Sequence, residues 1–218
     1  MSLETADLII NCGIAFFSAL AGAYAGARGA THWQERREDK QREADREAVI
    51  LRAAMLCKHY AQICSKIKGK ITEDGVKLEW FQVNVVDISM SSSLEQDLPG
   101  LFTSLGRNHG ALIESLIHAE WVAKSALSVS RIRDIEYREL QSFLIKKGSA
   151  QKLSKPEAIT LIGSAWVAKL DSMTKELHEA VSQSMEQNRV CHNELIGLLP
   201  ADKRKGKELI KKEPTLNL

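Results

Sequence analysis

An uncharged run near the N-terminus constrains this chain more than any other feature. Residues 8–27 read LIINCGIAFFSALAGAYAGA, which is twenty consecutive residues without a formal charge. A helix rises about 1.5 Å per residue, so twenty residues extend about 30 Å, the thickness of a bilayer's hydrocarbon core. The run therefore predicts a transmembrane anchor over residues 1–30, with the lipid bilayer as its surroundings.

The charges that flank the run predict how the anchor is oriented. Residues 1–7 contain no Lys or Arg, which also disfavours a cleaved signal peptide with a basic start. The basic residues follow the run instead: Arg28, Arg36, Arg37, Lys40, Arg42 and Arg46. Because Lys and Arg beside a span stay in the cytoplasm, we expect a single-pass protein of the bacterial inner (plasma) membrane. Its N-terminus faces out and its C-terminal body is cytoplasmic.

Small residues recur on one side of the run. Ser18, Gly22 and Gly26 lie four residues apart, so they share one face of a helix. Gly22 and Gly26 have the spacing of a transmembrane dimerisation motif, in which small side chains let two helices approach closely. We expect these three residues to pack membrane helices together, which would make the chain a homo-oligomer.

The remainder of the chain has the pattern of an all-α protein. Residues 33–47 are almost wholly polar and lack Pro and Gly, which predicts a charged, solvated helical linker over residues 31–48. Apolar residues then recur in alternating steps of four and three, which suits a short coiled coil or a bundle helix. We expect a cytoplasmic antiparallel bundle of three to four long helices over residues 49–199. A basic, disordered tail should follow over residues 200–218.

Within the bundle, the pattern assigns the core and leaves one segment ambiguous. Residues 77–90 suit a helix or a strand, and helix is preferred because no partner strand is evident. A long helix is expected over residues 108–147, where Arg133 interrupts the apolar series and should mark its solvent-reaching edge. The last helix begins with a capping box, Ser154 to Glu157. The predicted core residues are Leu56, Ile63, Leu116, Trp166, Leu170 and Leu177.

The chain carries none of the common catalytic motifs. It has no P-loop, no Gly-rich dinucleotide loop, no HExxH and no GxSxG. Glu114 and His118 share a helix face, but a di-metal bundle needs Glu-x-x-His, a spacing that this sequence lacks. The net charge of +2 gives no reason to expect nucleic-acid binding. We therefore expect no catalysis, no cofactor, no metal and no small-molecule substrate.

These observations predict a membrane-anchored helical interaction or assembly protein that meets an unknown protein partner at the cytoplasmic face. The alternative is an oligomeric membrane effector of the pore-forming, phage-defence or lysis type. The small-residue face motivates this alternative, and a lysis protein would place the body in the periplasm. Trp80, Trp121 and Trp166 fall on three predicted helices and suit either bundle packing or a partner-binding patch.

Overall fold

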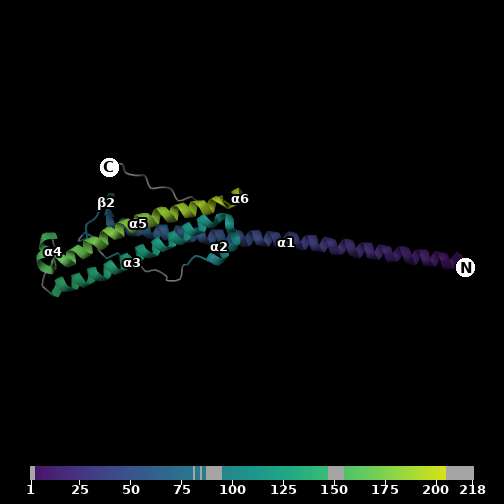
Figure 1. Ribbon diagram of the computed structural model, residues 1–218, viewed down its shortest axis with the longest axis horizontal. Helices are drawn as coiled ribbons and strands as arrows, with labels where there is room; N and C mark the ends of the chain where they lie inside the picture. Colours follow the sequence, from purple (N-terminus) through teal and green to yellow (C-terminus); the bar gives the residue numbers. More distant parts are fainter. Residues whose placement is uncertain (1–2, 81, 84, 87–94, 147–154, 205–218) are drawn as a thin grey trace. The chain divides into compact units, whose positions relative to one another are not determined.

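The computed structural model describes residues 3–80, 82–83, 85–86, 95–146 and 155–204, with side chains described from Ser18 onward except at positions 107, 155, 158, 202 and 203. The helices are α1 (Leu3–Ile71), α2 (Leu98–Leu105), α3 (Gly110–Lys146), α4 (Lys155–Ile162), α5 (Ser164–Gly197) and α6 (Ala201–Arg204). A two-residue hairpin, β1 (Thr72–Glu73) and β2 (Val76–Lys77), and a short 3-10 turn (Arg107–His109) complete the described elements (Figure 1). The predicted all-α class is confirmed.

The chain divides into two compact units, residues 1–47 and residues 48–218. In the first unit, every described side chain from residue 18 to residue 46 is exposed. Arg42 lies 3.8 Å from Glu38 and 3.9 Å from Asp39, which are helical charge pairs of the kind expected in the linker.

Over the part of the chain that the structure describes, no helix has the length and apolar character needed to cross a membrane. The side chains of residues 8–17, the first half of the uncharged run, lie outside the described residues. The anchor over residues 1–30 therefore stays a prediction.

The second unit is built on three long helices: the final part of α1 together with α3 and α5. Their directions follow from cross-helix contacts in which one residue number rises while the other falls: Ala54 with His192, Cys64 with Ser184, Ala119 with Asn188, and Arg133 with Thr174. Helix α5 is therefore antiparallel to both neighbours, and α1 and α3 are parallel to each other. Three packed long helices always include one parallel pair, and here it is α1 and α3, because the chain between them returns along the bundle before α3 begins.

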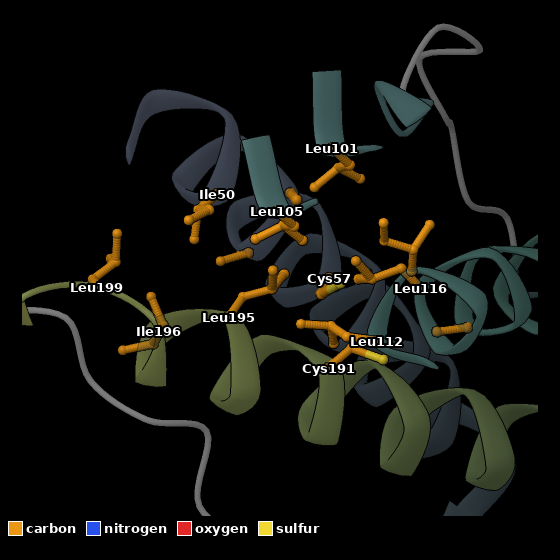
Figure 2. Close-up of a cluster of buried hydrophobic side chains, with 14 residues drawn as sticks. Ile50, Cys57, Leu101, Leu105, Leu112, Leu116, Cys191, Leu195, Ile196 and Leu199 are labelled. Carbon is orange, nitrogen blue, oxygen red and sulfur yellow. The ribbon is translucent and has the colours of Figure 1, made fainter. Parts of the chain in front are cut away.

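Buried apolar side chains fill the space between these helices. One cluster joins Ile50 and Cys57 of α1 to Leu116 of α3 and Leu195 of α5, and α2 covers it through Leu101 (Figure 2). Further clusters follow along the bundle, around Ile67 and Leu177, and then around Tyr137 and Leu170. Each cluster draws on residues far apart in sequence, so the second unit has a core of its own.

The chain leaves α1 through a tight hairpin and then departs from the prediction. Helix α1 ends at Ile71, and Asp74 and Gly75 turn the hairpin with φ of 48° and 82°. Beyond β2, the described residues of segment 78–86 are not helical, so the helix expected over residues 77–90 is wrong there. Residues 87–90 lie outside the described residues. We call residues 78–86 the connector.

Two further boundaries differ from expectation. The last predicted helix is interrupted at Gly163, whose φ of 89° favours glycine and separates α4 from α5. Ser154, the expected start of that helix, lies outside the described residues. The tail was predicted to be disordered from residue 200, but Ala201–Arg204 is helical, and Arg204 donates to the carbonyls of Gly197 and Leu199. These bonds satisfy carbonyl groups at the end of α5.

Candidate functional site

A buried polar cluster lies where the connector crosses α3 and α5. Arg133 of α3 is 0% exposed, which corrects the prediction that it marks a solvent edge. Its guanidinium donates to the carbonyl oxygens of Trp80 and Val83 and to Thr174 Oγ1 on α5. The described residues of the connector belong to no strand or helix that would satisfy these carbonyls, so the arginine takes the place of a backbone partner.

Two neighbours of Arg133 complete this cluster. Asp134 Oδ2 accepts from the amide of Val86 at 2.9 Å, and His178 Nε2 donates to the carbonyl of Leu78 at 3.2 Å. Burial lowers the pKa of His178, and the positive charges of Lys77 and Arg133 lower it further, against the Leu78 hydrogen bond. His178 is therefore neutral at pH 7. The polar atoms of this cluster hydrogen-bond the backbone of the connector and hold it in place, so their role is structural.

The three described cysteines are buried thiols of low reactivity. Burial, with a smaller effect from Cys191, raises the pKa of Cys57 to about 12, and burial raises the pKa of Cys191 to about 11. The pKa of Cys64 is also raised by burial. Because the thiolate is the nucleophile, thiols with raised pKa values do not serve covalent catalysis at neutral pH.

Glu114 and His118, which share a helix face as a pair of metal ligands can, are both exposed on α3. The imidazole of His118 stacks on the ring of Trp121, with centroids 6.0 Å apart and planes inclined by 14°. Within the described residues, no three His, Cys, Asp or Glu side chains come together in a way that could hold a metal ion.

An open groove of about 480 Å³ lies between the C-terminal part of α3 and the start of α5. Its lining includes the rings of Phe143 and Trp166, whose centroids are 6.0 Å apart, together with charged side chains. The described lining consists of Ile135, Arg138, Glu139, Ser142, Phe143, Lys146 and Trp166. Ser142 has no histidine beside it in this lining, so the groove lacks a nucleophile–base pair.

Large apolar side chains are exposed along one face of α3. Ile117, Trp121, Ile132 and Ile135 are exposed by 42%, 64%, 46% and 50%, respectively. At about 100° per residue, these four positions lie within about 60° of one another around the helix, opposite its buried face. Of the three tryptophans in the second unit, Trp80 is buried, Trp166 is half-buried and Trp121 is exposed. We call this exposed face of α3, from residue 114 to residue 139, the α3 stripe.

Sequence reasoning did not identify the α3 stripe as a surface. Over residues 108–147 it followed the longer apolar series, which is the one that faces the core. A second apolar repeat on the opposite face, at Ile117, Trp121, Ile132 and Ile135, was the available signal. A helix with two apolar faces buries one in its own bundle and leaves the other for a different contact.

The residues assigned from sequence lie in two places. Ser18, Gly22 and Gly26 are exposed, and a Cβ at either glycine would meet no atom of the described chain within 4 Å. The remaining assigned residues belong to the bundle: Leu56, Ile63, Leu116, Leu170 and Leu177 are buried, and Trp166 is half-buried beside the Leu170 cluster. None of these assigned residues lies beside a solvent-exposed group of titratable side chains in the described part of the chain.

Comparisons with known proteins give no relative: the chain matches no protein family, and no curated protein or solved structure is significantly similar to it.

Proposed function

We propose that this chain is a membrane-anchored helical assembly protein that acts at the cytoplasmic face of the inner membrane without catalysing a reaction. The observation that carries the proposal is the α3 stripe, on which four large apolar side chains are exposed on a bundle that already has a filled core. Apolar side chains gathered on one face of a protein mark an interaction site more often than chance exposure.

The uncharged run supplies the membrane part of the proposal. Its length suits a bilayer core, and the basic residues that follow it favour a cytoplasmic body. The charged stretch of α1 that follows is exposed over residues 31–46, as a segment that leaves the membrane for water should be. Tyr24 and Trp33, each with an arginine one turn later and within 6 Å of its ring, suit the interface region.

Extraction of membranes with alkaline carbonate tests the anchor. The full chain should sediment with the membranes and resist extraction, as integral proteins do. A variant with Phe17→Arg and Leu20→Arg places two charges in the run, each costing about 3 kcal/mol at a span's centre, and should become soluble. A control variant, Gln34→Arg with Gln41→Arg, adds the same charge to the exposed linker and should still sediment.

A reporter fused after Leu218 tests the orientation. A reporter that is active only in the cytoplasm should be active on the full chain. Activity of a periplasmic reporter at this position would contradict the proposal and favour the lysis-type alternative.

A further inference from the structure

We infer that the outward face of α1 within the bundle binds the phosphate backbone of a nucleic-acid duplex without reading its sequence. We call this surface the α1 basic face, and its exposed residues are Arg52, His59, Lys66 and Lys70. The inference goes beyond the proposed function and does not depend on it. The charge of this part of α1, the lack of carboxylate partners and the polarity of the face support it.

The stretch of α1 that belongs to the bundle is basic and free of acids. Residues 48–72 contain five Lys or Arg and no Asp or Glu, although the whole chain has 28 acids among its 218 residues. The net charge of +2 conceals this asymmetry, because acids elsewhere in the chain offset the bases. Lys and Arg clustered along one helix are the electrostatic signature of a protein that binds nucleic acid.

The fold places these cations in one line on the surface. At about 100° per residue, the four residues of the α1 basic face lie within about 40° of one another around the helix, opposite its buried side. Lys58 is half-buried at the edge of this line. From Arg52 to Lys70 the helix extends about 27 Å, which matches about eight base pairs of a duplex.

The protein itself does not neutralise this face. Within the described part of the chain, Arg52, Lys58 and Lys66 form no ion pair with a carboxylate. Lys70 donates to a neutral group, the carbonyl of Val86, at 3.1 Å. Several other cations of the bundle do have carboxylate partners: Lys124 with Glu120, Lys169 with Glu136, Lys175 with Asp171 and Arg189 with Glu186. The α1 basic face therefore keeps its positive charge for an anion outside the chain.

The polarity of the face indicates which polyanion it fits. A helix that lies on lipid buries an apolar side in the membrane, but the apolar side of α1 is already in the core, through residues such as Ile50 and Ile67. Between its cations the face presents Gln62 and one large apolar side chain, Met55. Arg, Lys and Gln are residues that contact phosphate oxygens. Unpaired bases would need an exposed aromatic ring for stacking, and Tyr60, the Tyr of this stretch, is buried, so a duplex fits better than a single strand.

The salt dependence of binding tests the contact. The full chain, kept in a non-ionic detergent, is titrated into an end-labelled DNA duplex of mixed sequence, and binding is measured by fluorescence anisotropy. With about four phosphate contacts, the logarithm of the binding constant should fall against the logarithm of the salt concentration with a slope of about −3.6. A slope near zero, or a dissociation constant above about 100 µM at about 50 mM salt, would overturn the inference.

Charge reversal tests whether the contact lies on α1. Arg52→Glu with Lys66→Glu should weaken binding at least about tenfold and make the slope shallower by about two, because two phosphate contacts are lost. The matched control, Arg131→Glu with Lys175→Glu, makes the same change in net charge on exposed side chains of α3 and α5. Because salt screens distant charges, this control should change binding by less than about threefold. Equal effects in two variants with unchanged circular dichroism would refute the assignment to the α1 basic face.

Alkylation at position 55 distinguishes a nucleic acid from a membrane surface. A chain with Cys12→Ser and Met55→Cys presents a reactive thiol on the face, because Cys57, Cys64 and Cys191 are buried. In vesicles of neutral phosphatidylcholine, excess duplex should slow alkylation by a water-soluble maleimide. Protection by vesicles that contain phosphatidylglycerol, without protection by the duplex, would assign the face to anionic lipid and overturn the inference. Carbonate extraction tests the anchor separately, so the inference and the proposed function can fail independently.

Discussion

The guanidinium of Arg133 has no access to solvent, and its partners lie on the connector and on α5. Replacement by Met keeps most of the volume but removes every donor. The carbonyls of Trp80 and Val83 would then be left in the interior without a partner, and Asp134 would lose its cation. We expect Arg133→Met to lower the free energy of unfolding by about 3 kcal/mol, as measured by urea denaturation.

The matched control for this substitution is Arg52→Met on α1. Arg52 is exposed, so the same change of side chain removes no buried hydrogen bond and should alter stability by less than about 0.5 kcal/mol. Equal effects of the two substitutions would show that the connector is not held by Arg133.

His178 makes the stability of the bundle depend on pH. Its pKa is lowered in the folded protein, mainly by burial, so between that pKa and about 6.5 the unfolded chain binds more protons than the folded one. The stability that comes from neutral His178 is complete above pH 7 and decreases as the pH falls through this window. Urea denaturation from pH 8 to pH 5 should show this loss.

Replacement of His178 by Gln isolates the contribution of this histidine. Glutamine keeps an N–H that can reach the carbonyl of Leu78 but does not titrate. The His178→Gln variant should therefore lose less stability between pH 7 and pH 5 than the native chain. An identical loss in both proteins would assign the pH dependence to other groups.

At the scale of elements, Gly163 determines where α4 ends and α5 begins. Its φ of 89° is a conformation that residues with a Cβ rarely adopt. We expect Gly163→Ala to destabilise the protein by about 1–2 kcal/mol in thermal or urea unfolding. Were residues 155–197 a continuous helix, as the sequence pattern suggested, the same change would stabilise it.

Gly69 offers the opposite case within α1. It lies in the last turn of α1 with helical neighbours on both sides, and an added Cβ would meet no neighbour within 4 Å. Gly69→Ala should therefore stabilise the protein by about 0.5–1 kcal/mol, the usual preference of a helix for alanine. The two substitutions should have opposite signs, and the same sign for both would contradict the assignment of a break at Gly163.

The long helices could be predicted from sequence because a buried face leaves a spacing of three and four in the residues themselves. The connector could not be predicted in this way. Trp80, Val83 and Val86 are buried and spaced like a helix face. Their backbone, however, is held by Arg133 and Asp134, through hydrogen bonds that span 48 positions or more along the chain. A charged residue such as Arg133 inside an apolar series is interpreted as exposed when the groups that pair with it are distant in sequence.

Helix direction was equally beyond the reach of periodicity. The apolar face of α3 has the same spacing whether its neighbour α1 runs parallel or antiparallel. The direction of α3 relative to α1 depends on the chain between Ile71 and Gly110. This chain returns along the bundle, so that α2 packs against the cluster that contains Ile50. Likewise, the α3 stripe is visible in the sequence as a second repeat, but only the structure shows which of the two faces is buried.

At the scale of the whole molecule, the chain divides into two compact units, residues 1–47 and residues 48–218. The two units should be separable in their contributions to stability and location. Residues 48–218 have their own core, whereas the described side chains of residues 18–46 are all exposed. Deletion of residues 1–30 should therefore leave the unfolding temperature of the bundle within about 2 °C of that of the full chain, as measured by circular dichroism in detergent. The deleted chain should no longer sediment with membranes. A large fall in the unfolding temperature would show that the first unit supports the second.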